Sequence, residues 1–166
     1  MNWTLVWKRL ASTSSRSTTG LVQSTKLELN CPKEPPTIEH MKTKAQIINE
    51  TASFYNTSNR GVGVIVNGEG LMETMCLYKT DSGNMCAVGR CLLPDSKAFN
   101  KLGGVMTVFE DEAEMDSQLQ PEYRGHSKRF WTSLQCFHDD DCNWNEDGLT
   151  SKGIEELNYL LVRYAK

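Results

Sequence analysis

The sequence predicts an α+β fold, in which a small antiparallel sheet of about three strands is packed by one N-terminal and two C-terminal helices. Three observations predict this class: a helical pattern before residue 56, turn signals and β-branched residues in the middle, and two helical patterns after residue 126. A helix followed by strands and then by helices favours α+β over an alternating α/β topology. The length of 166 residues suits one domain with a sizeable core.

Residues 1–36 are predicted to form a flexible basic arm, and residues 37–166 a single α+β domain. Residues 11–19 are almost entirely Ser, Thr and Ala, and three prolines close the arm. Such a composition buries too little apolar surface to offset the entropy of ordering. Trp3 and Trp7 are then candidate anchors for a protein partner, since exposed tryptophans are costly in water. An organelle targeting segment is an alternative for the same composition.

A first helix is predicted from Ile38 to Tyr55, with Thr37 as its N-cap. Apolar side chains recur along it at spacings of three and four and so share one face. They are Ile38, Met41, Ala45, Ile48, Ala52 and Tyr55. The polar segment from Asn56 to Gly61 ends the helix.

The middle of the chain is predicted to be β-rich. Val62 to Val66 is a short apolar run followed by turn residues. Cys76 to Lys79 and Met85 to Val88 flank a Gly- and Asn-containing turn, which indicates a hairpin because these residues tolerate a positive φ. Val105 to Phe109 is predicted to be a further strand.

Two helices are predicted to close the chain. The first runs from Ser127 to His138 and places Phe130, Leu134 and Phe137 on one stripe. The second begins after the N-cap Thr150, with Leu149 and Ile154 in the positions of a hydrophobic staple. Its predicted buried face consists of Ile154, Leu157, Leu161 and Tyr164.

Charge and hydropathy disfavour several functional classes. The net charge of −3 gives no electrostatic reason to expect nucleic-acid binding, although residues 1–30 alone carry +3. No apolar run approaches the roughly 18 residues that span a bilayer. Residues 1–10 contain no apolar signal-peptide core, so secretion through a signal peptide is not expected. The six cysteines are therefore expected to be reduced thiols.

The cysteines and histidines raise an alternative, a zinc-stabilised module or a metal-dependent enzyme. The candidate zinc ligands are Cys86, Cys91, Cys136, His138 and Cys142. Their spacings lie at or beyond the edge of the usual range for structural zinc, and Cys76 and Cys86 are alternatively a half-buried pair across the predicted hairpin. A thiolate pair of Cys86 or Cys91 with a histidine has no supporting motif, so no catalytic residue is predicted.

Other residues are candidates for contact with a partner. Arg90 lies alone among apolar neighbours, which suits an interface anchor or, alternatively, an ion pair with the acidic run of residues 110–116. Within that run, Glu110, Asp111 and Glu112 either face a basic partner or are solvated. Trp144 is either an exposed contact or a plug between the last two helices.

The segment Asp81-Ser82-Gly83-Asn84-Met85-Cys86-Ala87-Val88-Gly89-Arg90-Cys91 resembles one found in small uncharacterised proteins of tailed bacteriophages and some bacteria. Asn59-Arg60-Gly61, Phe137-His138-Asp139 and Asn143-Trp144 add to the resemblance, which covers about residues 45–164. It implies no activity and no functional residue. It does imply a viral protein that works in the cytoplasm of a bacterial host or in a virion.

The sequence therefore predicts a non-enzymatic phage-type accessory or virion protein that acts through protein–protein contacts. Its predicted partner is a viral or bacterial protein, with neither a membrane nor a nucleic acid involved. No cofactor is predicted, and zinc is the alternative.

Overall fold

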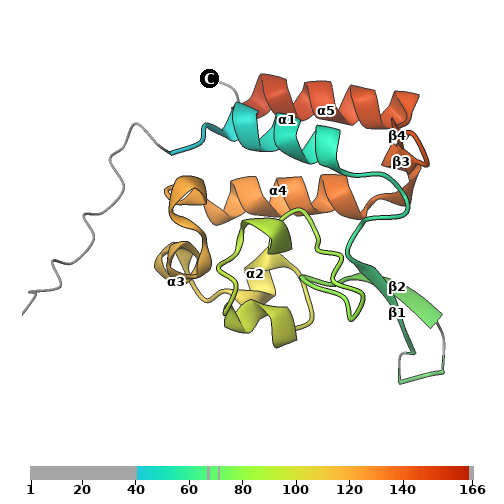
Figure 1. Cartoon of the computed structure of the whole chain (residues 1–166), viewed down its shortest axis with the longest axis horizontal. Helices are drawn as coiled ribbons and strands as arrows, with labels where there is room; N and C mark the ends of the chain where they lie inside the picture. The colour runs from blue at the N-terminus through green and yellow to red at the C-terminus, as the bar shows by residue number, and fades with distance from the viewer. Residues whose placement is uncertain (1–40, 67, 71, 165–166) are drawn as a thin grey trace, which may run out of the picture. The chain divides into compact units, whose positions relative to one another are not determined.

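The structure is a computed structural model that describes residues 41–66, 68–70 and 72–164 (Figure 1). Within these residues it contains five α-helices and two antiparallel sheets of two strands each, which confirms the α+β class. The predicted arm, with Trp3 and Trp7, lies outside the described residues. In the described part of the chain, no helix is both long enough and apolar enough to cross a membrane.

Helix α1 (Lys44–Phe54) begins later than predicted. Residues 41–43 are not helical, because Thr43 and Gln46 form a capping box that fixes the first turn. The Thr43 hydroxyl accepts from the Gln46 amide at 3.2 Å, and the Gln46 side chain accepts from the Thr43 amide at 2.7 Å. The predicted start at Ile38 is therefore wrong. Ile47, Ile48 and Thr51 form the buried face of the helix.

Helices α4 (Lys128–Asp139) and α5 (Ser151–Tyr164) confirm the two predicted C-terminal helices. Together with α1 they pack against one another, and their axes run in similar directions (Figure 1). Ser127 caps α4 by accepting from the Phe130 amide, and the Thr150 hydroxyl accepts from the Gly153 amide at the start of α5. Both starts could be predicted because both caps are local.

The buried face of α5 differs from the predicted one. Gly153 is buried so close to the 3₁₀ turn Asp141–Asn143 that an added Cβ would meet the Asn143 carbonyl oxygen at 2.2 Å. This approach turns Gly153 and Leu160 inward and leaves Ile154 exposed. Leu157, Leu161 and Tyr164 pack against the core as partly buried side chains. The prediction for Ile154 is therefore wrong, because backbone proximity decides the rotation of the helix.

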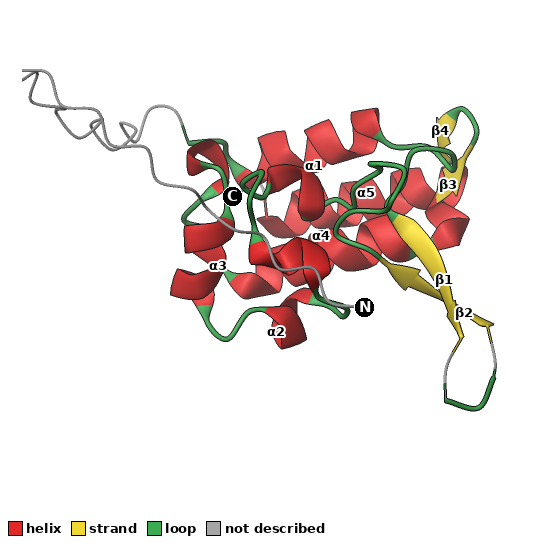
Figure 2. Ribbon diagram, turned by 60° about the horizontal axis from the view of Figure 1, so that its bottom comes forward, coloured by secondary structure: helices red, strands yellow, loops and turns green. Residues whose placement is uncertain are grey.

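The first sheet is a hairpin that projects from the helices (Figures 1 and 2). Strand β1 (Val62–Val66) pairs antiparallel with β2 (Met72–Cys76). The predicted hairpin around residues 81–84 is only a turn, in which the Thr80 amide donates to the Asn84 carbonyl and Gly83 adopts a φ of 90°. Of its predicted flanks, only Cys76 lies in a strand, as the last residue of β2, and the flanks are joined by an isolated bridge between Lys79 and Met85. The second sheet pairs β3 (Trp144–Asn145) with β4 (Gly148–Leu149).

Helix α2 (Val105–Val108) replaces the predicted strand over these residues. The Val105 amide at its start donates to the side chain of buried Gln135 in α4 at 2.9 Å. Val105 and Val108, three residues apart, are buried on one side of α2, which packs against α4. Helix α3 (Glu112–Gln118) follows. In the part of the chain that the structure describes, four 3₁₀ turns connect the elements: η2 (Gly89–Cys91), η3 (Lys97–Asn100), η4 (Pro121–Tyr123) and η5 (Asp141–Asn143).

Candidate functional site

A sulfur, a nitrogen and an oxygen donor meet where the end of β2 reaches the C-terminal end of α4. Cys76 Sγ, a ring nitrogen of His138 and a carboxylate oxygen of Asp139 all lie within 4.8 Å of one another. His138 Nδ1 is 2.9 Å from Asp139 Oδ1. The hairpin thus places the Cys76 thiol beside the His138–Asp139 pair, which is far away in the sequence.

His138 is fully buried, and its surroundings hold it firmly. Its ring lies edge-on to Tyr55, with 4.5 Å between the ring centroids. Its backbone carbonyl accepts from Arg60 Nη1 at 2.8 Å and from Trp144 Nε1 at 3.0 Å. Among the described residues, its Nε2 atom has no hydrogen-bond partner. Nδ1 is the ring nitrogen that faces Asp139, and Nε2 points away from that carboxylate.

The charge state of the cluster argues against thiolate catalysis. The neighbouring Cys86 thiol and burial raise the pKa of Cys76 well above its usual range. Burial would lower the pKa of His138, but the hydrogen bond to Asp139 and the Cys76 thiol outweigh it and raise that pKa. Cys76 therefore keeps its proton at neutral pH, whereas an active nucleophile needs the thiolate.

The cluster borders a pocket of about 370 Å³. Cys76 and Asp139 line the pocket together with Gln135 and Cys136. Gln135 Nε2 donates to Cys76 Sγ at 3.4 Å. The thiol and the carboxylate are thus reachable from outside, whereas the imidazole lies behind them.

The structure gathers only part of the predicted zinc set. His138 belongs to the cluster, and Cys86 lies beside Cys76 while its sulfur accepts from the Gly89 amide at 3.3 Å. Cys91 is buried elsewhere in the core, and burial raises its pKa to about 12. Cys136 and Cys142 are exposed, and neither belongs to the cluster. Among these five residues, the predicted common site is therefore not formed.

Sequence reasoning missed Cys76 and Asp139 as members of the cluster. One signal was present, because the predicted pairing of Cys76 with Cys86 brings these two thiols together as observed. The other signal was the His138-Asp139 dipeptide, which supplies an imidazole and its carboxylate partner from one helix end. No sequence pattern links the two pieces.

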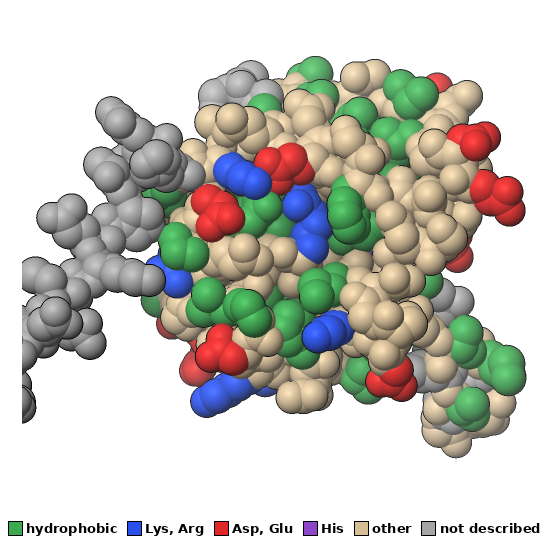
Figure 3. All heavy atoms as spheres, viewed as in Figure 1, with side chains coloured by type: hydrophobic (Ala, Val, Ile, Leu, Met, Phe, Trp, Pro, Cys, Tyr) green, Lys and Arg blue, Asp and Glu red, His purple; other side chains and the backbone are tan. Residues whose placement is uncertain are grey.

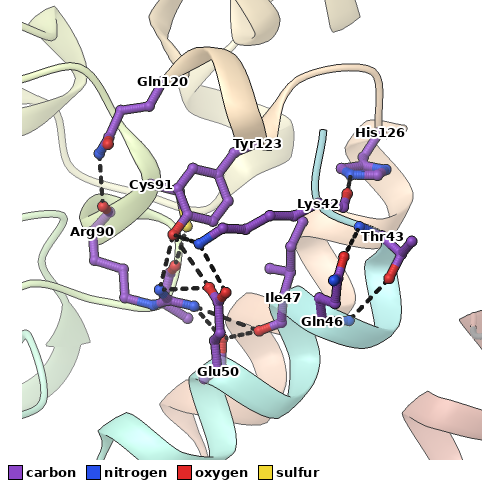
Figure 4. Close-up of polar contacts among 12 residues, drawn as sticks. Lys42, Thr43, Gln46, Ile47, Glu50, Arg90, Cys91, Gln120, Tyr123 and His126 are labelled. Carbon is purple, nitrogen blue, oxygen red and sulfur yellow. Dashed lines mark hydrogen bonds and ion pairs between the residues drawn. The ribbon is translucent and has the colours of Figure 1, made fainter. Parts of the chain in front are cut away.

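Arg90 belongs to a polar network around Glu50 (Figure 4). Arg90 Nη1 lies 3.4 Å from Glu50 Oε2, and Lys42 Nζ lies 2.8 Å from Glu50 Oε1. The Tyr123 hydroxyl accepts from Lys42 at 2.9 Å and donates to Glu50 at 3.2 Å. Arg90 therefore pairs with α1 rather than with the predicted acidic run. His126 also faces Lys42, whose carbonyl oxygen accepts from His126 Nε2 at 2.9 Å.

Replacing Glu50 by Gln should remove a pH-dependent part of the stability. Burial would raise the pKa of Glu50, but Lys42 and Arg90, together with the Tyr123 hydroxyl, hold it below its ordinary value of 4.5. A depressed pKa in the folded state stabilises the protein above pH 4.5, and this contribution is lost as the pH falls further. Because the side chain is 35% exposed, we expect a loss of about 1 kcal/mol or less.

The measurement is urea denaturation at neutral pH and again well below pH 4.5. The wild type should exceed Glu50→Gln in stability at neutral pH, and the difference should shrink in acid. Glu155→Gln, on the exposed side of α5, is the matched control. A constant difference at both pH values would show that the carboxylate charge is not what Glu50 contributes.

The acidic run has a local structural role. Asp111 caps α3 by accepting from the Glu114 amide at 2.7 Å, and Glu112 accepts from the Lys128 amide at 3.3 Å. The positive end of the helix dipole also stabilises acidic side chains in the first turn of a helix. Glu110 is exposed before the helix. Contact of this run with a basic partner stays a prediction.

Trp144 is buried, with 4% of its surface exposed. Its ring packs against Phe137 and Tyr55 at centroid distances of 5.3 and 6.0 Å. The structure shows a packed ring, as one predicted alternative expected, but its aromatic contacts are with α4 and with the residue after α1 instead of with α5. A role for Trp144 as an exposed partner contact is wrong, because the ring offers almost no free surface.

Two features of the structure have functional potential. One is the donor cluster of Cys76, His138 and Asp139, and the other is the projecting β1–β2 hairpin, whose second strand ends at Cys76. The cluster has the donor types of a transition-metal site. In comparisons with models of protein families, with curated proteins and with solved structures, the chain matches none of them.

Proposed function

We propose that the protein is a non-enzymatic accessory protein that acts by binding another protein, and that the β1–β2 hairpin is its main contact surface. The supporting observation is the exposure of Val64, Val66 and Met72, at 65%, 65% and 80% of their surface. These are large apolar side chains on an element that leaves the helical body (Figure 1). Exposed apolar clusters of this kind mark interaction sites.

The register of the hairpin places the three side chains together. Val66 lies opposite Met72 in the antiparallel pair, and Val64 lies two residues before Val66. Because side chains alternate between the two faces of a strand, all three share one face of the ribbon. Figure 3 shows hydrophobic side chains gathered on this projecting element. The hairpin therefore presents an apolar stripe instead of scattered residues.

The hairpin is also a suitable template for strand pairing. The sheet contains only β1 and β2 among the described residues, so each strand has an outer edge without a neighbouring strand there. A two-stranded ribbon is marginally stable in water, and further strands or packing stabilise it. A partner that covers the apolar stripe would supply this packing, and a partner segment that pairs with a free edge would supply a further strand.

The phage-type part of the proposal rests on the resemblance of residues 81–91. It favours a viral or bacterial protein as the partner, met in host cytoplasm or in a virion. The arm, with Trp3 and Trp7, is a second proposed contact element.

Photo-crosslinking from the hairpin tests the proposal. A photoreactive amino acid at Val64 of the full-length chain should give a discrete protein adduct in extract of the native cells, identified by mass spectrometry. The same group at Glu155 on α5 is the matched control and should give none. Adding Val66→Asp and Met72→Asp should abolish the Val64 adduct while the circular dichroism spectrum stays unchanged. Equal crosslinking from both positions, or an adduct that survives both substitutions, would exclude the hairpin as the contact surface.

Replacing Trp3 and Trp7 by Ala in the same assay tests the arm. Loss of the Val64 adduct would show that the arm contributes to the same complex. An unchanged adduct would remove the arm from the proposal and leave the hairpin as the contact element.

A further inference from the structure

We propose that Cys76, His138 and Asp139 bind a transition-metal ion, and that zinc is the ion they fit best. The three donor atoms already lie within 4.8 Å of one another without an ion. Tetrahedral zinc, with bonds near 2.1 to 2.3 Å, places its ligand atoms roughly 3.5 Å apart. Small side-chain rotations would therefore bring the three donors to coordinating positions.

The donor types select the class of ion. A thiol and an imidazole are ligands for zinc and related transition metals, whereas calcium and magnesium prefer oxygen ligands alone. Binding transfers the Cys76 thiol proton to solvent, so the thiolate and the Asp139 carboxylate together balance the two positive charges of the ion. Charge neutrality matters here because an unbalanced charge at a buried site is costly.

The ring nitrogen that faces the cluster is Nδ1 of His138, which lies 2.9 Å from Asp139 Oδ1. Coordination through Nδ1 leaves the proton of the neutral imidazole on Nε2. The ion would thus take the place of the proton that the imidazole and the carboxylate otherwise share. Because His138 is fully buried and its backbone carbonyl accepts from Arg60 and Trp144, the imidazole is held beside the other two donors.

The pocket beside the cluster gives the ion a route of entry and an open coordination position. Its volume of about 370 Å³ borders Cys76 and Asp139, so the ion would have three protein ligands and a free side toward solvent. Cys86 lies next to Cys76, but its sulfur already accepts from the Gly89 amide, so it is not included in the ligand set. Three protein ligands with an open position are typical of reactive zinc sites, whereas structural sites have four.

Metal titration of the full-length chain tests this inference. The protein is treated with a chelator under reducing conditions and titrated with Co²⁺, whose thiolate charge-transfer absorption reports a bound cysteine, and Zn²⁺ is then added in competition. We expect one Co²⁺ per chain, displaced by Zn²⁺, and a higher melting temperature with the ion bound. Absence of the thiolate absorption would overturn the proposal.

Variants identify the ligands. Cys76→Ser should weaken Zn²⁺ binding by about 100-fold or more, and Asp139→Asn by about 10- to 100-fold. The matched controls are Cys136→Ser and Cys142→Ser, which replace exposed thiols outside the cluster. Both should bind Zn²⁺ as the wild type does. Wild-type affinity in Cys76→Ser, or loss of binding in a control, would refute the assignment.

Folding of the metal-free variants is checked by circular dichroism. If Cys76→Ser does not fold, Asp139→Asn decides the question, because its side chain is partly exposed and the change is isosteric. The metal proposal is independent of the hairpin contact. Crosslinking from Val64 and Zn²⁺ titration therefore succeed or fail separately.

Discussion

Replacing Trp144 by Ala should destabilise the protein by about 3–5 kcal/mol, the range found for large aromatic side chains removed from a core. The ring is 4% exposed and packs against Phe137 and Tyr55, so its removal leaves a cavity between α1 and α4. The Nε1 hydrogen bond to the His138 carbonyl is lost as well. Urea denaturation followed by circular dichroism measures the change.

Trp144→Phe separates packing from hydrogen bonding. Phe keeps an aromatic ring in the same place but cannot donate to the His138 carbonyl, which still accepts from Arg60. We therefore expect Trp144→Phe to cost about 1 kcal/mol for the lost hydrogen bond, plus a smaller packing loss than in Trp144→Ala. A change below about 1 kcal/mol in Trp144→Ala itself would contradict burial of the ring and would restore its role as an exposed contact.

The two last helices could be predicted because their starts depend on neighbouring residues. Ser127 and Thr150 each cap the amide three residues ahead, and that spacing is visible in the sequence. The start of α1 shows the limit of this reasoning. The Thr43–Gln46 capping box is equally local, yet the apolar periodicity extends back to Ile38 and favoured an earlier start.

Two errors have a tertiary cause. Val105 to Val108 has β-branched residues, but a buried glutamine of α4 satisfies the Val105 amide and α4 covers the valines, so helix α2 forms. The predicted strand from Met85 to Val88 is likewise not formed: Met85 makes only isolated bridges, with Lys79 and with the distant Arg60, and the 3₁₀ turn η2 follows at Gly89. In both places a contact with a distant segment outweighs the local preference, and the sequence does not reveal that segment.

The donor cluster could be predicted only in its parts. His138, one of the predicted candidate ligands, does belong to the cluster, and an imidazole beside carboxylates is visible in the sequence. The predicted partners Cys136 and Cys142 follow from closeness in sequence, yet helix α4 exposes Cys136 while it buries His138. The thiol that does meet His138 comes from β2. Only the fold brings Cys76 to the end of α4.

Replacing Gly89 by Ala should destabilise the protein by about 3 kcal/mol, the upper part of the usual range for overpacking. A Cβ at this position would lie 1.9 Å from the Tyr78 carbonyl oxygen and 2.8 Å from its carbon. Both contacts are with backbone, so no side-chain rotation relieves them. Thermal and urea denaturation measure the loss. Gly68→Ala is the matched control, because nothing lies within 4 Å of its Cβ, and it should change the stability by less than about 0.5 kcal/mol.

The Gly89 variant also tests how the site is supported. The Gly89 amide donates to Cys86 Sγ, and Cys86 lies beside Cys76, so a displaced η2 would move both thiols relative to His138. We therefore expect the folded fraction of Gly89→Ala to bind Co²⁺ more weakly than the wild type, although Gly89 is not a ligand. Loss of stability with unchanged Co²⁺ binding would show that β2 and α4 hold the donor cluster without η2. Unchanged stability would mean that the Tyr78 and Gly89 backbones do not approach each other as described.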